Sequence, residues 1–281
     1  MRPIIPDNIK KRVSINSKSE QVKNILKRFN INTVCENAVC PNIYECFCKG
    51  YATFMILGNR CTRNCKFCGV LPLNKSTLPD IEEPENIAKA IKLLDMKYVV
   101  ITSPTRDDLI DGGAEQFAIT TKYIKQLNTT IKIELLIPDM QGNKHNLETI
   151  FKAKPDIISH NIETVPSLYP SIRPSSNYKT SLKVLKVIKE KGFITKSGFM
   201  VGLGESRNEV IELMHTLKNN GCDYLVIGQY LRPSKSAVPV KEFIPEEVFK
   251  EYEDTGKKLG FKNVFAGVFY RSSYLAEQLI Q

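Results

Sequence analysis

The sequence lacks any apolar run near the ~20 residues that a membrane-spanning helix needs, so we expect no membrane insertion. Its first segment, MRPIIPDNIKKRVSINSKSE, lacks the apolar core of a secretory signal and is too short and proline-punctuated for a transit peptide. We therefore expect a cytoplasmic globular protein.

Histidine is scarce, with three residues in 281, which argues against a mechanism built on several histidines.

Acidic residues are fewer than basic ones, 30 against 40, which gives a formal net charge of +10. Such a balance favours contact with an acidic partner, but it does not distinguish nucleic acid, a membrane surface or an acidic protein. The excess is mostly lysine scattered among Asn and Ile, as in a general compositional bias. We therefore expect neither a nucleic-acid partner nor a membrane partner.

Cysteine is too sparse for a disulfide scaffold, since the chain has eight and no secretion signal. Seven of the eight lie between Cys35 and Cys68, and Cys222 stands apart. This clustering indicates metal or cofactor ligation in the first quarter of the chain.

From residue 52 onward, short β-prone apolar runs alternate with longer helical segments, a pattern typical of repeated βα units around a buried parallel sheet. The predicted strands are 52–57, 98–102, 131–137, 156–159, 194–201 and 224–227. The predicted helices are 85–94, 114–127, 147–152, 180–191, 206–219 and 246–259, with Thr180 and Ser206 as candidate N-caps.

Polar or glycine-rich residues follow nearly every predicted strand, in the order GNRCTRNCKFC, SPTRDD, PDMQG, HNIET, GLGES and GQYLRPS. Any single loop is polar for ordinary reasons of solvation. Six such loops after six apolar strands indicate one shared site at the carboxyl end of a barrel. We predict an α/β fold, a partial (β/α)6 TIM-type barrel over 51–235, with an N-terminal extension over 1–50 and a C-terminal helical segment over 236–281.

Cys61, Cys65 and Cys68 follow the first predicted strand, with three and then two residues between them. Three thiolates on one loop can hold three irons of a [4Fe-4S] cluster and leave the fourth iron open to a substrate or cofactor. A structural zinc knuckle usually has paired C-x2-C halves and four ligands, so it fits this spacing poorly. We expect Arg60, Arg63 and Lys66 to offset the charge of the cluster.

Cys35, Cys40 and Cys46 form a second group, separated by four and five residues. A second set of three thiolates implies a second cluster whose fourth ligand comes from elsewhere. Cys48 is the nearest candidate and Cys222 a remote one, although each is also well explained as a small buried apolar residue.

The segment CTRNCKFC resembles the cysteine motif of the radical S-adenosylmethionine (SAM) superfamily, whose members have partial or complete βα barrels. VCENAVCPNIYECF before it, and SPTRDDLIDGGAEQF, ELLIPDMQG, SHNIETVPSLYPSIRP, TKSGFMVGLGES and RSSY after it, resemble the lipoyl synthase family over about residues 31–275. In that family the second serine of RSSY ligates the auxiliary cluster, which maps to Ser273, with Ser272 as the fallback. The chain departs from the family at Ser236 and Ala237, where a histidine pair is common, and in having Cys48.

The resemblance implies a sulfurtransferase that inserts two sulfur atoms at C6 and C8 of a protein-bound octanoyl-lysine and so forms the lipoyl cofactor. It also implies two [4Fe-4S] clusters and SAM as cofactors, with the auxiliary cluster as the sulfur donor and the RSSY tail closing on it. The implied partners are octanoylated lipoyl carrier domains, namely 2-oxoacid dehydrogenase E2 subunits and glycine cleavage H protein, and an electron donor such as ferredoxin or flavodoxin.

Two other functions stay open at this point. A radical SAM methylthiotransferase acting on tRNA also has two clusters, but such enzymes usually carry an RNA-binding module, for which little sequence follows Tyr274. An iron–sulfur carrier would have no use for six strands with polar ends.

Several polar residues at strand ends are candidates for binding SAM. Arg173 suits the carboxylate because a guanidinium can pair with it through two bonds. Phe67 is a candidate for packing on adenine, or else belongs to the local core. Asp107, Asp108 and Asp111 are expected to cap a helix rather than to form an acidic site. The remaining SAM candidates are Thr102, Ser103, Asn161 and Glu163.

Overall fold

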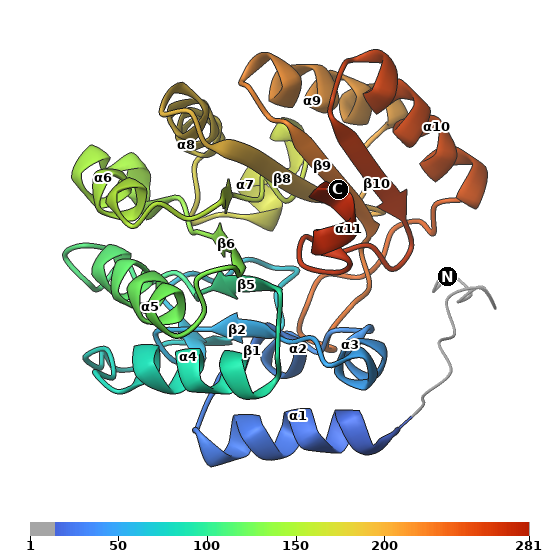
Figure 1. Ribbon diagram of the computed structural model, residues 1–281. Helices are drawn as coiled ribbons and strands as arrows, with labels where there is room; N and C mark the ends of the chain where they lie inside the picture. Colours follow the sequence, from blue (N-terminus) through green and yellow to red (C-terminus); the bar gives the residue numbers. More distant parts are fainter. Residues whose placement is uncertain (1–14, 281) are drawn as a thin grey trace. The chain divides into compact units, whose positions relative to one another are not determined.

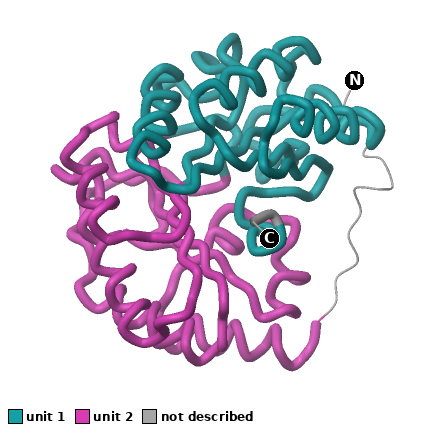
Figure 2. The backbone as a smooth tube through the Cα atoms, turned by 45° about the horizontal axis from the view of Figure 1, so that its top comes forward, with its two compact units in different colours: residues 1–12, 64–68, 159–281 teal, residues 13–63, 69–158 magenta. Residues whose placement is uncertain are grey.

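The computed structural model describes residues 15–280, which form two compact units. Within these residues, unit 1 contains 64–68 and 159–280, and unit 2 contains 15–63 and 69–158 (Figure 2). The boundary between the units crosses the loop that carries Cys61, Cys65 and Cys68, so Cys61 belongs to unit 2 and Cys65 and Cys68 belong to unit 1.

Unit 2 contains a mostly parallel sheet in the order β1-β2-β5-β6-β7, with helices packed beside it (Figure 1). Its strands are β1 Asn32–Thr33, β2 Thr53–Met55, β5 Tyr98–Thr102, β6 Lys132–Leu136 and β7 Ile157–Ser159, the last ending at the unit boundary, and β3 Arg60–Cys61 pairs with β4 Leu71–Pro72. Its helices are α1 Ser17–Arg28, α2 Val34–Asn37, α3 Ile43–Lys49, α4 Glu83–Leu93, α5 Ala114–Leu127 and α6 Lys144–Lys152, with a 3-10 turn, η2, at Met140–Gly142.

Unit 1 contains three parallel strands in the order β8-β9-β10. They are β8 Ile194–Val201, β9 Tyr224–Gln229 and β10 Asn263–Gly267. The helices are α7 Tyr169–Ile172, α8 Tyr178–Glu190, α9 Arg207–Asn219, α10 Glu246–Lys258 and α11 Ala276–Ile280, with a 3-10 turn, η3, at Pro166–Leu168.

The cores follow from the periodicity of the sequence. In α5 the buried residues Ala114, Phe117 and Ile124 recur at helical spacing, so one face of the helix is apolar. In unit 1, Val201 of β8 and Ile227 of β9 are buried in one cluster with side chains of α9 and α10. Burial of these faces positions the strand ends from which the functional loops start.

Most predicted elements are confirmed, and the structure also contains elements that were not predicted. The strand β10 was not predicted, and Thr180 does not cap its helix: Asn177 does, by accepting a hydrogen bond from the Thr180 amide at 3.0 Å. The predicted cap Ser206 is confirmed, because it forms a capping box with Glu209 at the start of α9. The short strands β1, β3 and β4 and the short helices α2, α3 and α7 were not predicted either.

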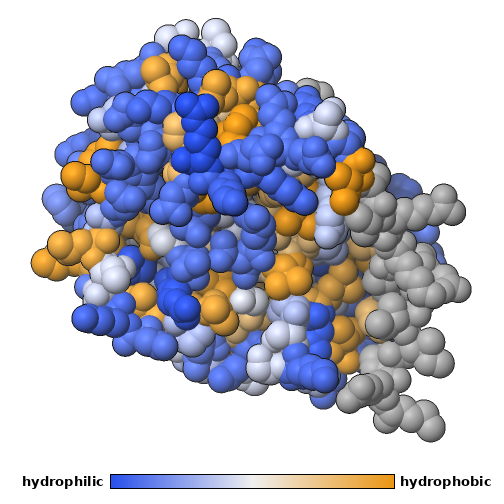
Figure 3. Space-filling view, turned by 90° about the horizontal axis from the view of Figure 1, so that it is seen from below, coloured by the Kyte–Doolittle hydropathy of each residue, from blue (hydrophilic) through white to orange (hydrophobic). Residues whose placement is uncertain are grey.

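On the face shown in Figure 3, hydrophilic side chains predominate and the apolar ones gather in small separate patches. No helix within residues 15–280 has both the length and the apolar character needed to cross a membrane.

Candidate active site

The carboxyl ends of three neighbouring strands in unit 2 lie at the same level. Met55 at the end of β2 is in register with Thr102 at the end of β5, and Thr102 is in register with Leu136 at the end of β6. The loops that follow these strands therefore leave the sheet at one edge, as the sequence predicts for a shared site. These loops carry Cys61 and Arg63, then Asp107, then Asp139.

Arg63 joins the three loops. Its guanidinium pairs with Asp107, at 2.7 Å from Nε to Oδ2, and with Asp139, at 2.6 Å from Nη1 to Oδ2. Burial lowers the pKa of Arg63, but the two carboxylates reverse this and hold it above its ordinary value. Burial raises the pKa of Asp107, and the ion pair with Arg63 outweighs this and lowers it. Arg63 and Asp139 are buried, at 7% and 2% exposure, whereas Asp107 lies at the surface, so water is excluded mainly from the pair of Arg63 with Asp139.

This network differs from two expectations. The charge of Arg63 is matched by two carboxylates, so Arg63 does not serve as a free cation that offsets a cluster. Asp107 does not cap a helix, and Asp108 pairs with Arg106 at 2.8 Å instead of capping one. Asp111 does cap α5, since its carboxylate accepts the amides of Gly113 and Glu115, each at 2.9 Å.

The cysteine loop is also held through its backbone in unit 2. The Arg63 amide donates to the sulfur of Cys61 at 3.4 Å, and the Thr62 amide donates to the Thr105 carbonyl at 2.9 Å. Amide hydrogen bonds to cysteine sulfur are a feature of iron–sulfur sites, where they stabilise the thiolate charge.

In unit 1 the rest of the loop, residues 64–68, is fixed by two strand-like hydrogen bonds. The Lys66 amide donates to the Ile172 carbonyl at 2.8 Å, and the Val238 amide donates to the Lys66 carbonyl at 2.9 Å. The ring of Phe67 packs against a small apolar cluster that contains Leu203 and Tyr230. Phe67 is thus part of the local core on at least one side.

Arg173 lies beside Cys65 in unit 1. Its Nη1 donates to the Tyr169 hydroxyl at 2.5 Å, and its guanidinium contacts Cys65. Burial lowers the pKa of Arg173, while Tyr169, Glu163 and Cys65 raise it, with a net rise. Its Nε is buried without a hydrogen-bond partner among the described residues. A buried cation with an unsatisfied donor is suited to an anionic ligand.

Glu163 and Asn161 follow β7 and lie near the same guanidinium. Glu163 has a left-handed backbone, with φ of 71°, and bridges to Phe199 of β8. Burial raises the pKa of Glu163 against the opposing effects of Arg173, Asn161 and Arg271. A non-glycine residue held in this region is strained, and such strain is concentrated at functional sites.

The candidates at the end of β5 differ from each other. The Thr102 hydroxyl donates to the Leu136 carbonyl at 2.8 Å and so ties two strands together. The Ser103 hydroxyl is buried, and none of the residues in 15–280 satisfies it. Of these two, Ser103 has the hydroxyl that is available to a ligand.

The other cysteine group belongs entirely to unit 2. Cys35 is in α2, Cys46 is in α3, and Cys40 lies between them with its amide donating to the Cys35 carbonyl at 3.0 Å. Burial raises the pKa of Cys35 to about 12, so metal binding at this thiol must displace a proton. A Cβ on Gly69, just after Cys68, would lie 3.1 Å from the Ala38 carbonyl oxygen, so a larger residue at position 69 would crowd the backbone between Cys35 and Cys40.

The chemistry of these donors fits iron–sulfur clusters. All eight cysteines are free thiols without disulfide bonds, and the six that form the two predicted groups lie on short loops and helix turns. Thiolates are the ligands that iron–sulfur clusters require. Cys222 belongs instead to the core of unit 1, and burial raises its pKa to about 12, which agrees with its alternative interpretation as a small buried residue.

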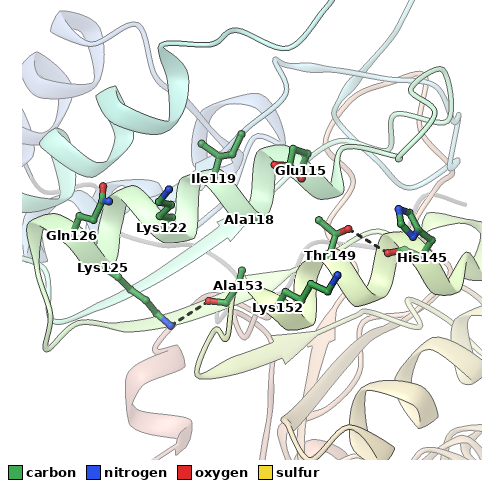
Figure 4. A pocket seen from close by; sticks show the side chains of 10 residues that line it. All are labelled: Glu115, Ala118, Ile119, Lys122, Lys125, Gln126, His145, Thr149, Lys152 and Ala153. Atoms are coloured by element: carbon green, nitrogen blue, oxygen red, sulfur yellow. Dashed lines mark hydrogen bonds between the residues drawn. The ribbon is translucent and has the colours of Figure 1, made fainter.

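A surface hollow between α5 and α6 contains none of the predicted site residues (Figure 4). Lysines 122, 125 and 152 line it, with Lys125 donating to the Ala153 carbonyl at 3.3 Å. It therefore has no part in the site described above.

Sequence reasoning missed two sets of residues. Asp139 lies 76 positions from its partner Arg63, and no local pattern connects them. Lys196 is fully buried in β8, where its Nζ donates to the Ser272 carbonyl at 2.8 Å. The one sequence signal for the contact of Lys196 with Ser272 was a lysine inside the predicted buried strand 194–201.

Comparison with known proteins identifies the family. The model of the radical SAM superfamily matches residues 55–217. The chain is 50% identical to the lipoyl synthase of Caldicellulosiruptor saccharolyticus, over 97% of this chain and 96% of that protein. It is 51% identical to the lipoyl synthase of Alkaliphilus metalliredigens, over 92% of this chain and 90% of that protein. The tRNA methylthiotransferase alternative finds no support in these matches.

Solved structures agree on the fold. Methylornithine synthase PylB has a TM-score of 0.59 at 17% identity, over 75% of this chain and 62% of that one. Streptococcus suis SuiB bound to S-adenosylmethionine has a TM-score of 0.59 at 14% identity, over 92% of this chain and 67% of that one. The predicted radical SAM fold class is confirmed. The chain belongs to the lipoyl synthase family of radical SAM enzymes.

Proposed function

We propose that this chain is a sulfurtransferase that inserts sulfur at C6 and C8 of a protein-bound octanoyl-lysine to form the lipoyl cofactor. The observation that carries the proposal is the near-full-length similarity to lipoyl synthases, together with two separate groups of three cysteines. When bound, the two [4Fe-4S] clusters and SAM supply the radical that removes hydrogen from these carbons and the sulfide that replaces it.

Cys61, Cys65 and Cys68 would hold the cluster that SAM binds, and three protein ligands would leave one iron open to SAM. Arg63 supports this role by fixing the loop to two neighbouring strand ends. The Arg63 amide stabilises the Cys61 thiolate. These residues hold the cluster and do not transfer protons.

Arg173 and Glu163 bind the charged groups of SAM. Arg173 binds the carboxylate, which its unsatisfied Nε and its position beside Cys65 support. Glu163 and Asn161 bind the amine or the ribose, and Ser103 offers its hydroxyl at the end of β5. Thr102 contributes by fixing that strand end, and Phe67 packs on the adenine.

Cys35, Cys40, Cys46 and Ser273 hold the auxiliary cluster, which donates the sulfur. A hydroxyl oxygen is a harder and weaker ligand for iron than a thiolate. Ser273 would therefore be the weakest of the four protein ligands of this cluster.

The substrate is an octanoylated lipoyl domain. The proposed carriers are E2 subunits of 2-oxoacid dehydrogenases and glycine cleavage H protein, and the proposed electron donor is ferredoxin or flavodoxin. The proposed location is cytoplasmic, without nucleic-acid or membrane partners. The chain divides functionally into the auxiliary-cluster segment 1–50, the core 51–235 and the C-terminal segment 236–281. The net charge of +10 supports docking to an acidic carrier surface.

Anaerobic incubation with SAM, a reductant and an octanoyl-lysine peptide tests the proposal. The expected result is deoxyadenosine formation coupled to sulfur insertion in the peptide. A parallel incubation with tRNA is the control. Sulfur insertion into tRNA, or deoxyadenosine formation that the peptide does not stimulate, would overturn the proposal.

A further inference from the structure

The RSSY segment of unit 1 forms a tight turn. The Tyr274 amide donates to the Arg271 carbonyl at 2.9 Å, so Ser272 and Ser273 are the two central residues of the turn. The Arg271 guanidinium holds the backbone before the turn by donating to the carbonyls of Val268 and Tyr270, at 3.2 and 2.6 Å. The turn therefore has a defined shape.

The two central serines differ in their contacts. The Ser272 hydroxyl donates to Asn161 Oδ1 at 2.7 Å, and the Ser272 carbonyl accepts from Lys196 Nζ at 2.8 Å. Within the described part of the chain, the Ser273 hydroxyl takes part in no hydrogen bond with a protein group. One serine is thus held at two atoms, and its neighbour keeps its hydroxyl available.

The strands beneath the turn are shaped to receive it. A Cβ on Gly198 of β8 would lie 2.7 Å from the Ser272 hydroxyl oxygen and 3.1 Å from Asn161 Oδ1. A Cβ on Gly228 of β9 would collide with the Tyr270 carbonyl oxygen. Gly228 is in register with Gly267 of β10, where a Cβ would lie 3.1 Å from the Tyr270 ring. Glycines on three adjacent strands therefore give the tail room to lie against the sheet.

Burying the Lys196 ammonium costs free energy unless its N–H groups form hydrogen bonds. Lys196 is 0% exposed, and one of its donors is used on the Ser272 carbonyl. A hydrogen bond from a charged donor contributes more than a neutral one. Lys196 therefore holds the backbone of the turn against β8, and Asn161 holds the Ser272 side chain and so sets the orientation of the turn.

We propose that Lys196, Asn161 and Gly198 form a seat for the RSSY turn that commits Ser272 to structure and leaves Ser273 as the oxygen ligand of iron. Lys196 and Asn161 act here as positioning residues. The assignment of Ser273 to iron rests on the proposed function, whereas the seat itself is a property of the protein chain.

Hydrogen exchange of the full chain without iron tests the seat directly. Removing one charge-assisted hydrogen bond is expected to speed amide exchange across residues 271–275 about tenfold or more in Lys196→Met. Ser272→Ala is expected to have the same effect with smaller risk to folding. Ser273→Ala should stay within about twofold of wild type, because its hydroxyl holds nothing in the chain. Lys186→Met, on the exposed face of α8, is the matched lysine control.

A spectroscopic measurement then links the seat to iron. In a chain whose Cys61, Cys65 and Cys68 are replaced by alanine, electron paramagnetic resonance reports the auxiliary cluster alone, in dithionite-reduced protein for a four-iron cluster and in oxidised protein for a three-iron cluster. Lys196→Met and Ser273→Ala are each expected to convert its signal to that of a three-iron cluster. Amide exchange across residues 271–275 should be faster in Lys196→Met and unchanged in Ser273→Ala.

The outcomes separate the two claims. Wild-type exchange in both Lys196→Met and Ser272→Ala would overturn the seat, as would equal acceleration in Ser273→Ala and Ser272→Ala. A four-iron signal in Lys196→Met together with accelerated exchange would overturn the link to iron. If wild-type protein assembles no auxiliary cluster, the proposed function fails, while the exchange result still decides the seat.

Discussion

Arg63 and Asp139 form a buried ion pair with two parallel hydrogen bonds, from Nη1 to Oδ2 at 2.6 Å and from Nη2 to Oδ1 at 2.7 Å. Arg63 lies between two cysteines of the predicted cluster loop, and Asp139 follows β6. Bidentate pairs of this kind fix orientation as well as distance. The pair therefore sets the position of the cysteine loop relative to the strand ends of unit 2.

Asp139→Asn should destabilise the chain by about 3 kcal/mol, the low end for a broken buried pair, because Arg63 keeps Asp107. Urea denaturation of wild type and variant measures the difference. The control is Asp95→Asn, which removes an exposed pair with Lys97 and should change stability by less than about 1 kcal/mol. Equal effects of the two variants would show that the buried pair does not hold the loop.

Replacing Arg173 should weaken SAM binding. Arg173→Met removes the charge and the buried donors, so the Kd for SAM should rise about tenfold or more. Arg173→Lys keeps the charge but loses the two-bond geometry, so it should lie between wild type and Arg173→Met. Equilibrium dialysis with anaerobic, iron-loaded protein measures the Kd, with the exposed Arg207→Lys as control. An unchanged Kd in Arg173→Met would refute the assignment.

Alkylation of the iron-free chain should divide the cysteines into two classes. Cys35 and Cys222 are buried with pKa values raised to about 12, so both thiols stay protonated and should resist iodoacetamide. The other six are partly exposed and should react. Mass spectrometry of digests reads the pattern, and denaturation should make all eight reactive.

Loading with iron and sulfide should then leave Cys48 as the one partly exposed thiol that still reacts. The predicted ligands Cys40, Cys46, Cys61, Cys65 and Cys68 should become protected. Protection of Cys48, or continued labelling of Cys40, would require a different ligand set.

Ser273→Cys should assemble the auxiliary cluster but suppress sulfur insertion, because a thiolate holds iron more firmly than a hydroxyl does. We expect at least about a tenfold loss of lipoyl product, with deoxyadenosine formation retained. Ser273→Thr is the matched control, since it keeps a hydroxyl oxygen at this position. Full sulfur insertion by Ser273→Cys would contradict the proposed role of the oxygen ligand.

Secondary-structure elements with a strong local sequence pattern could be predicted from the sequence. β5, at Tyr98–Thr102, is a continuous apolar run and was predicted with its observed bounds. β10 was missed because NVFAG is short and contains alanine and glycine, which are weak strand formers. Asn177 and Thr180 both suit an N-cap, and only the backbone conformation decides between them.

The candidate site was predicted as a set of residue types, not as a network. Cysteine spacing indicates clusters because ligands of one cluster lie close in sequence. Arg63 was predicted to offset cluster charge, and the structure instead pairs it with carboxylates that are 44 and 76 positions away. Long-range pairing of this kind depends on strand register, which the sequence leaves open. The contact of Lys196 with Ser272 is of the same long-range type.

The iron and sulfide content of anaerobically prepared protein tests the central claim of two clusters most directly. Wild type should contain about eight irons and eight sulfides per chain. Cys35→Ala and Cys61→Ala should each fall to about four, since each variant disables a different cluster. About four irons in wild type, equal loss of all iron in either variant, or zinc in place of iron would contradict the account.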